Sequence, residues 1–273
     1  MASVTWGVAT DTGRVRRTNE DSALAQPPVF VIADGMGGHA GGDVASSLVV
    51  AEFVALGGRD TISREDVATA IARANDRILE HANATGEPGM GTTVTGIAVV
   101  APGGVEHWLV FNVGDSRVYR WTRDRLAQIT VDHSEVQELV DRGEIAAADA
   151  RSHRRRSVVT RALGSDPAPE PDSWLLPLVS GERFLICSDG LVAELSDLRI
   201  AEALTVVSPD AAAELLVRRA VEAGGSDNVT VIVVDVVAAE NGAGAPDEDT
   251  RPHLEFGVRS TGASASDVPD ADG

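Results

Sequence analysis

Two apolar runs that each lead into an Asp-Gly pair constrain the fold of this chain most strongly. Residues 29–33 read VFVIA and are followed by Asp34, and residues 184–187 read FLIC and lead, after one serine, into Asp189. Neither run alternates apolar with polar residues, which is typical of a strand covered on both faces. We therefore expect a layered core whose strands deliver these two carboxylates into glycine-containing loops, where the two acids meet.

Length and composition indicate a globular protein. The chain has 273 residues, of which 43% are hydrophobic, and this is enough to bury one large core or two small ones. No apolar run approaches the roughly 20 residues that a membrane helix needs, and the N-terminal residues lack the basic and apolar regions of a signal peptide. We expect no membrane partner, a cytoplasmic location and a monomer.

The charge of the chain argues against nucleic acid as a partner. The formal net charge is −19, and the basic side chains are all arginine, whereas a phosphate backbone demands clustered basic residues. An acidic excess is compatible with cation binding, although it is more often a solvated surface. The single cysteine, Cys187, lies inside an apolar run and is expected to be a small buried residue.

The composition changes once, near residue 238. From there to the C-terminus the sequence is rich in Gly, Ala, Ser, Pro and Asp and has too few apolar residues to order itself. We therefore predict a folded domain over residues 1–237 and an acidic, disordered tail over residues 238–273. Within the tail only the stretch 252–260 has closely spaced apolar residues, as a short docking motif or by chance.

The pattern before residue 238 predicts one domain that mixes helices and strands. Helical spacing covers 43–56, 63–83, 133–150 and 210–224, whereas strand patterns cover 92–101, 106–114, 116–122 and 228–237. Ser63 and Asp66 form a capping signal at the start of the second helix. Strands in series favour antiparallel sheets with helices outside, rather than a doubly wound parallel sheet.

Several acidic residues lie where an apolar strand adjoins a loop. They are Glu20, Asp21, Asp34, Asp115, Asp189 and Asp227. Any one of them alone would be an ordinary turn or cap residue, but carboxylates brought together need either protons or a metal ion. All-oxygen ligands select hard ions such as Mg²⁺ and Mn²⁺, while the scattered histidines and lone cysteine offer no zinc site.

Six motifs in a fixed order carry a resemblance to a known family. They are GRVRRTNED (13–21), ADGMGGHAGG (33–42), GMGTT (89–93), VGDSR (113–117), CSDG (187–190) and GGSDNVT (224–230). Over residues 4–236 the chain resembles the bacterial metal-dependent protein serine/threonine phosphatases of the PPM family, the 2C type. The resemblance implies an α+β fold, a four-layer α-β-β-α sandwich of two antiparallel sheets, with metal ions at one edge between the sheets.

The resemblance also implies a centre with two Mn²⁺ or Mg²⁺ ions and, as in many bacterial members, a third. Asp34 would bridge the two ions and Gly35 would offer its carbonyl group, while Asp189 and Asp227 would bind the other ion. The remaining implied roles are water holding by Glu20, third-ion binding by Asp115 and phosphate binding by Arg16. The implied reaction is hydrolysis of protein phosphoserine and phosphothreonine by a metal-activated water, which would reverse bacterial Ser/Thr kinases acting on their substrates.

Two departures from the family pattern concern histidines. Eukaryotic members place a proton-donating histidine directly after the Asp-Gly pair, whereas this chain has Met36 there and its histidine comes later, as His39. His39 is either a displaced donor or an ordinary loop residue. His153 and the three arginines 154–156 occupy the place of a mobile flap in bacterial members, and these arginines either attract phosphorylated peptides or solvate a loop.

Three alternative functions are weighed against general protein dephosphorylation. A partner-switching phosphatase that acts on one anti-anti-sigma-type regulator shares the fold and stays open. An inactive phosphatase fold used as a sensor is disfavoured because the acids are intact. A nucleotide-binding loop at 33–42 is disfavoured because helices follow it, whereas a dinucleotide fingerprint needs a parallel βαβ unit.

The predicted tail gives the first test. Deleting residues 238–273 should leave turnover of a small phosphoester unchanged, because no motif lies in this segment. Steady-state assays of the full chain and the truncated chain on p-nitrophenyl phosphate measure this directly. A large loss of turnover on truncation would mean that the tail contributes to the folded domain.

Overall fold

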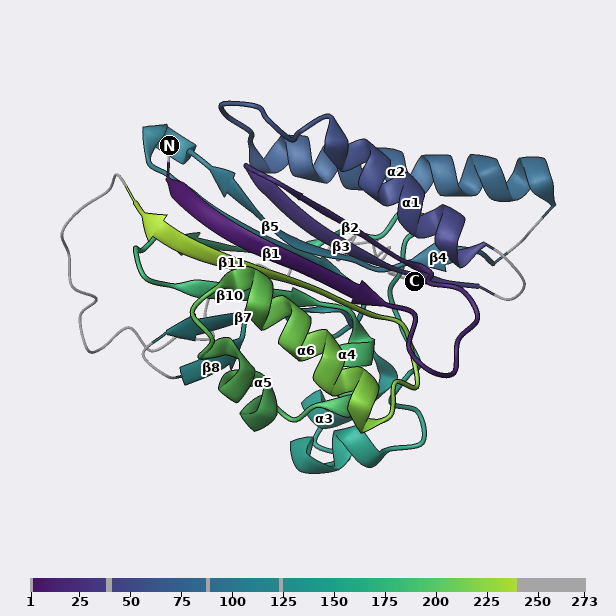
Figure 1. Cartoon of the computed structure of the whole chain (residues 1–273). Coiled ribbons are helices and arrows are strands. Elements are labelled where there is room, and N and C mark those ends of the chain that lie inside the picture. The colour runs from purple at the N-terminus through teal and green to yellow at the C-terminus, as the bar shows by residue number, and fades with distance from the viewer. Residues whose placement is uncertain (1, 38–40, 87–88, 123–124, 240–273) are drawn as a thin grey trace, which may run out of the picture. The chain divides into compact units, whose positions relative to one another are not determined.

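Two antiparallel sheets stack between two layers of helices in the computed structural model, which describes residues 2–37, 41–86, 89–122 and 125–239 (Figure 1). All of these residues belong to one compact unit. Helices α1 and α2 cover one sheet, and helices α4, α5 and α6 cover the other (Figure 1). The predicted α-β-β-α sandwich is therefore confirmed.

The strand order shows how each sheet brings distant segments together. The first sheet runs β1 (Ser3–Asp11), β11 (Val229–Ala238), β10 (Arg183–Cys187), β7 (Arg117–Thr122) and β8 (Arg125–Gln128). The second sheet runs β2 (Asp21–Gln26), β3 (Val29–Met36), β5 (Val94–Val100), β6 (His107–Val113) and β9 (Asp172–Pro177), with the short β4 (Gly91–Thr92) beside β3. All of these strand pairs are antiparallel.

The helices and short turns connect these strands. The helices are α1 (Gly42–Val54), α2 (Arg64–Thr85), α3 (Glu135–Asp141), α4 (Asp189–Glu194), α5 (Asp197–Leu204) and α6 (Pro209–Ala223), with 3-10 turns η1 (Pro102–Gly104) and η2 (Ala147–Ser152). None of the helices in the described ranges has the length and apolar character needed to cross a bilayer.

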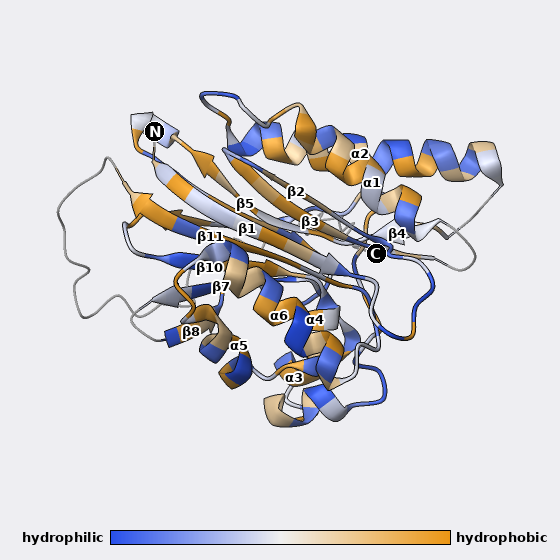
Figure 2. Cartoon of the chain, in the orientation of Figure 1, coloured by the Kyte–Doolittle hydropathy of each residue, from blue (hydrophilic) through white to orange (hydrophobic). Residues whose placement is uncertain are grey.

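Three layers of core explain the apolar strands that do not alternate. In β3, Val31 packs among residues of α1 and α2, whereas its neighbour Ile32 packs between the two sheets. In β10, Leu185 faces the α4–α6 side and Ile186 faces the space between the sheets. Figure 2 shows apolar residues concentrated along the strands and mixed with polar ones along the helices. Both faces of these strands are buried, as the sequence predicts.

Local signals predicted some element ends correctly and one wrongly. Helix α2 begins with a complete capping box, in which the Ser63 hydroxyl accepts from the Asp66 amide and the Asp66 carboxylate accepts from the Ser63 amide. The helix predicted over 133–150 is wrong, because α3 ends at Asp141 and is followed by Gly143 with φ of +71°. This left-handed glycine stops the helix, and a separate 3-10 turn follows.

His39 and most of the predicted tail lie outside the residues that the structure describes. His39 belongs to the undescribed segment 38–40, and the predicted tail is undescribed from residue 240 onward. At the boundary of the tail, β11 continues to Ala238, and the amide of Ala239 donates to the Ser180 hydroxyl at 2.9 Å.

Candidate metal centre

The strand ends that carry the two Asp-Gly pairs meet in the structure. Asp34 lies near the end of β3, directly opposite Asp21 of β2 in the strand register. Asp189 follows β10 and opens α4, and its charge acts on the Asp34 carboxyl group and raises the pKa of that group. Asp227 precedes β11 and acts electrostatically on Asp21, Asp34 and Asp189. The expectation that the acids of residues 34 and 189 meet is therefore confirmed.

The backbone of Asp34 is held rigidly by the strand next to it. Its amide donates to the Thr93 hydroxyl at 3.0 Å, and its carbonyl group accepts from the Thr93 amide and the Thr92 hydroxyl, both at 2.9 Å. The Thr93 hydroxyl in turn contacts the Ser116 hydroxyl at 2.9 Å, next to Asp115. These contacts explain the two threonines of the GMGTT motif, because both hold the backbone of Asp34 in place.

Gly35 allows three segments to approach one another beside Asp34. Its amide donates to the Glu20 carbonyl oxygen at 3.1 Å. A side-chain Cβ at this position would lie 2.1 Å from the Gly42 oxygen and 2.7 Å from the Glu20 oxygen. Any larger residue would push β3, α1 and the loop before β2 apart, so the need for glycine here is steric.

Asp227 and Asn228 fasten the loop of residues 12–20 to the start of β11. The Arg16 guanidinium donates to the Asp227 carboxylate at 2.8 Å and lies 3.9 Å from the Glu20 carboxylate. Asn228 accepts from the Glu20 amide at 2.9 Å and donates to the carbonyl oxygens of Thr12 and Thr18. Arg16 remains half exposed, with 49% of its side chain accessible, so its guanidinium can still reach a ligand.

Asp115 lies in the loop between β6 and β7 and interacts electrostatically with Asp189. It is only 7% exposed, and burial raises the pKa of its carboxyl group to about 8, with help from the charges of Asp189 and Asp132. The preceding residue, Gly114, has φ of +115° and closes the turn. Asp115 is thus buried and held at a defined place beside Asp189.

Burial and mutual repulsion raise the pKa values of the whole cluster. Burial is the largest cause in each case and raises the pKa of Asp21 and of Asp189 to about 6. Asp34 keeps a partly exposed edge, yet protein atoms surround its carboxyl group, and burial followed by Asp21, Asp189, Asp115 and Asp227 raises its pKa well above the ordinary value. Without a cation these groups hold protons that free aspartates would release.

Asp21 is a residue of this cluster that the sequence-based site assignment missed. Its Oδ2 atom accepts from the Ser188 hydroxyl at 2.9 Å, whereas its Oδ1 atom is buried without a hydrogen-bond partner. The charges that act on the carboxyl group of its neighbour Glu20 are those of Arg16, Asp43 and Asp227. Sequence placed both acids at a strand edge, but only the register opposite Asp34 shows that Asp21 faces the centre.

The donor set fits hard cations, although the ligands are not yet in place for one. The described residues contain no group of three or more acidic, histidine or cysteine side chains already arranged to hold an ion. Even so, the cluster offers only carboxylate oxygens, carries uncompensated repulsion and contains a buried, unpartnered oxygen on Asp21. A divalent cation such as Mn²⁺ or Mg²⁺ prefers such oxygen ligands, would offset the repulsion and would give the Asp21 oxygen a partner.

Comparisons with known proteins agree with this geometry. The family model described as Protein phosphatase 2C matches residues 17–214. The serine/threonine protein phosphatase PstP of Mycobacterium tuberculosis is 41% identical over 257 residues, which is 90% of this chain and 48% of that protein. The chain therefore spans about half the length of this relative. The serine/threonine phosphatase stp of Listeria innocua is 35% identical over 83% of this chain and 93% of its own length.

A solved structure supports the same relationship. The catalytic domain of the phosphatase PstP, in complex with two manganese ions, matches with a TM-score of 0.78 and 36% identity. The match covers 86% of this chain and 99% of that domain. Identity at this level over nearly a whole domain extends the likeness beyond the arrangement of sheets and helices.

The raised pKa values predict how stability depends on pH when no metal is present. The folded cluster keeps protons that the unfolded chain, with aspartates near 3.8, has lost, so the free energy of unfolding should fall as pH rises from about 4 to about 8. We expect a loss on the order of a few kcal/mol between about pH 5 and about pH 8. Urea unfolding in the presence of a chelator measures it.

Adding Mn²⁺ is the control for this prediction. A cation replaces the protons of the cluster, so the stabilisation by Mn²⁺ should be larger at about pH 8 than at about pH 5. An increase in the free energy of unfolding of the metal-free protein over this pH range would contradict the raised pKa values of the cluster.

Proposed function

Since the chain belongs to the protein phosphatase 2C family, we propose that it hydrolyses phosphoserine and phosphothreonine in proteins at a centre of two Mn²⁺ or Mg²⁺ ions. One observation carries the proposal: five carboxylates from separate strand ends converge beside an arginine that keeps half of its side chain exposed, and these carboxylates are Asp21, Asp34, Asp115, Asp189 and Asp227. Carboxylates gathered at a buried sheet edge need either protons or cations to offset their repulsion, and cations would supply the chemistry of this family.

The carboxylates and the glycine carbonyl would divide the work of holding the ions. Asp34 lies at the middle of the cluster, with the carbonyl group of Gly35 beside it, while Asp189 and Asp227 flank it from the other sheet. Glu20 interacts electrostatically with Asp227, and Asp115 with Asp189. Cations bound there would supply a nucleophilic water and offset the negative charge of a phosphate group.

Arg16 is suited to bind the phosphate group of the substrate. Its guanidinium is fixed by the hydrogen bond to Asp227, which is the largest cause that raises the pKa of Arg16, so the group stays charged. About half of the side chain remains accessible, and a guanidinium can hold two phosphate oxygens side by side. The arginine therefore orients the phosphorus toward the cluster without entering it.

The chain offers no cysteine nucleophile, which favours direct attack by water. Cys187 is fully buried in β10, and burial raises the pKa of its thiol to about 12. A thiol in this state is neither charged nor accessible to a phosphoester. Hydrolysis in a single displacement thus requires only groups that bind the substrate, orient it and move protons.

We further propose that the chain acts as a cytoplasmic monomer that reverses bacterial Ser/Thr kinases, on the kinases themselves and on their substrates. The relatives in Mycobacterium tuberculosis and Listeria innocua are named serine/threonine phosphatases, which supports phosphorylated proteins as the class of substrate. The alternative is a partner-switching phosphatase with one anti-anti-sigma-type substrate. A phosphoproteome comparison after gene deletion distinguishes many changed proteins from a single one.

The metal assignment predicts the effect of neutralising single acids. Changing Asp34, Asp189 or Asp227 to Asn should lower kcat with Mn²⁺ on p-nitrophenyl phosphate by roughly 100-fold or more, because each loses a charged ligand. The control is Asp210→Asn, which changes an exposed acid in the first turn of α6. Circular dichroism should show all four variants folded. Near wild-type turnover by Asp189→Asn would refute the metal assignment.

Asp115 predicts a difference between two kinds of substrate. A serine leaving group needs a proton, whereas p-nitrophenolate does not, and Met36 beside Gly35 cannot donate one. We propose that the part of the cluster around Asp115 supplies the proton that a serine leaving group needs. Asp115→Ala should therefore lower kcat on phosphoserine peptides by roughly 10- to 100-fold while largely sparing p-nitrophenyl phosphate. Equal losses on both substrates, or none on either, would contradict the assignment.

A further inference from the structure

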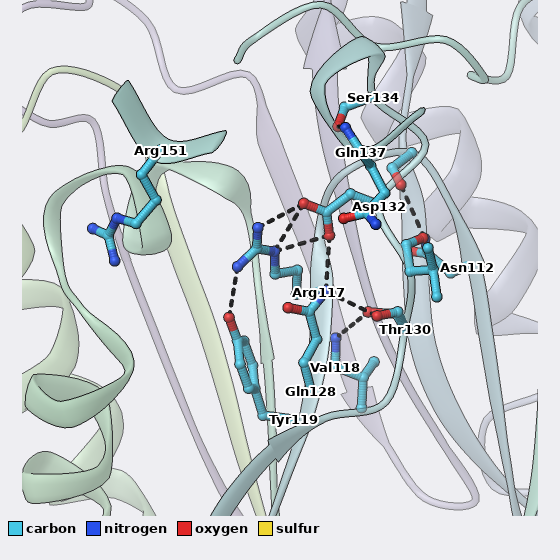
Figure 3. Close-up of polar contacts among 12 residues, drawn as sticks. Asn112, Arg117, Val118, Tyr119, Gln128, Thr130, Asp132, Ser134, Gln137 and Arg151 are labelled. Carbon is cyan, nitrogen blue, oxygen red and sulfur yellow. Dashed lines mark hydrogen bonds and ion pairs between the residues drawn. The ribbon is translucent and has the colours of Figure 1, made fainter. Parts of the chain in front are cut away.

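The loop that carries Asp115 is gripped by the segment of residues 129–134, which we call the clamp segment. Residues 129–133 of this segment each bind the end of β6, the β6–β7 connection or the start of β7. The contacts join Ile129 and Thr130 to Val118, Val131 to Asn112, Asp132 to Arg117 and His133 to Gly114. Figure 3 shows part of this network, with the Arg117 guanidinium between Asp132 and Tyr119.

His133 makes the contact nearest to Asp115. Its Nδ1 atom accepts from the Gly114 amide at 3.0 Å, and its own amide donates to the Gly114 carbonyl oxygen at 2.9 Å. The backbone just before Asp115 is therefore bound at both its donor and its acceptor. Gly114 has φ of +115°, a conformation that side-chain-bearing residues rarely adopt, so this turn relies on such contacts to stay in place.

The hydrogen bonds also define which nitrogen of His133 carries the proton. A backbone amide can only donate, so Nδ1 accepts and the proton of the neutral ring lies on Nε2. This Nε2 atom lies 3.2 Å from the Asp172 Oδ2 atom and donates to it. Asp172 belongs to β9 and receives a second bond from Arg161 at 2.7 Å.

Asp172 remains an anion and keeps this arrangement fixed. The hydrogen bond from His133, followed by contacts with Arg161, lowers the pKa of Asp172 to about 2 in spite of partial burial. A permanent acceptor next to Nε2 holds the ring in a single orientation, with Nδ1 directed at Gly114. His133 itself is only 8% exposed, so water does not compete for either nitrogen.

We propose that His133 is a positioning residue that sets the place of the Asp115 carboxylate through Gly114, with Asp172 and Arg161 orienting the imidazole. The inference rests on the proposed function, because it assumes that Asp115 contributes to cation binding. Groups that orient a metal ligand from behind typically change metal affinity or activity by roughly 10- to 100-fold when they are replaced.

Two substitutions separate the two nitrogens of His133. In His133→Asn the side-chain oxygen takes the place of Nδ1 and can still accept from Gly114, whereas the bond to Asp172 is lost. In His133→Gln the amide reaches toward Asp172 but offers no acceptor near Gly114. His107→Gln is the matched control, because His107 lies at the other end of β6 and its ring hydrogen-bonds to the Val105 carbonyl oxygen, away from the Asp115 loop.

Hydrogen exchange on the metal-free protein gives a readout that is independent of catalysis. The peptide that covers residues 112–117 should exchange faster in His133→Gln than in wild type, and His133→Asn should restore most of the protection. Calorimetric titration with Mn²⁺ should show a loss of roughly 10- to 100-fold in the affinity of the weakest ion for His133→Gln and a smaller loss for His133→Asn.

The outcomes decide the proposal in either direction. Unchanged exchange in His133→Gln would show that the histidine does not hold the loop, and faster exchange with unchanged Mn²⁺ affinity would show that the loop does not set cation binding. Either result overturns the proposal. If the wild-type protein binds Mn²⁺ but has no phosphatase activity, the proposed function fails, while exchange and affinity still decide the role of His133.

Asp172→Ala keeps the test open if both His133 variants fail to fold. Asp172 lies at the start of β9, with 42% of its side chain exposed, so the substitution leaves no large cavity. It should reproduce the faster exchange and weaker Mn²⁺ binding of His133→Gln in milder form. Glu144→Ala, which removes an exposed partner of Arg142, is its control. Indistinguishable behaviour of these two variants would overturn the proposal.

Discussion

Mutual repulsion among buried carboxylates is the constraint on which the rest of this structure depends. Asp34 experiences the charges of Asp21, Asp115, Asp189 and Asp227 in a setting where burial already disfavours ionisation. Left to themselves, such groups would turn away from one another or draw the strand ends apart. They remain together because their strands are covered on both faces by three layers of apolar core, so that the backbones have no freedom to separate. Packing of the apolar strands therefore keeps the acidic residues together, although repulsion between their carboxylates would drive the strand ends apart.

Each acid is also held by a backbone anchor of its own, and the anchors are of different kinds. Asp34 is fixed by the hydroxyl and amide of Thr93, Asp227 by its position next to Asn228, and Asp115 by the grip of His133 on Gly114. None of these anchors contacts a carboxylate oxygen of Asp34 or Asp115, so the anchors themselves do not occupy the oxygens that a cation would need. A site that binds through charge is therefore built mostly from neutral groups. This division is common where function requires a locally unfavourable arrangement, which the surrounding fold must then offset.

The sequence predicts those features that depend on neighbouring residues. An apolar run that leads into Asp-Gly identifies Asp34 and Asp189, and the Ser63 cap identifies the start of α2. The role of Asp21 could not be predicted in this way, because it follows from the register of β2 against β3, which joins residues 21 and 34 through the sheet. His133 acts through the amide of Gly114, a group that every residue except proline possesses, so no side-chain pattern reveals the contact. The helix expected over 133–150 failed at Gly143, where a left-handed turn outweighs the apolar spacing around it.

Through its hydrogen bond with Arg16, Asp227 belongs both to the candidate phosphate-binding group and to the acidic cluster. One carboxylate serves both the arginine that faces outward and the cluster that faces inward, so an anion that engages Arg16 alters the charge that Asp227 presents to a cation. Coupling of this kind is reciprocal, because the two binding free energies share one thermodynamic cycle. Under the proposed function, the release of phosphate at the end of a turnover and the metal occupancy of the centre would then be linked quantities. An inhibitor built as a phosphate mimic would accordingly show an apparent affinity that varies with the concentration of divalent ion.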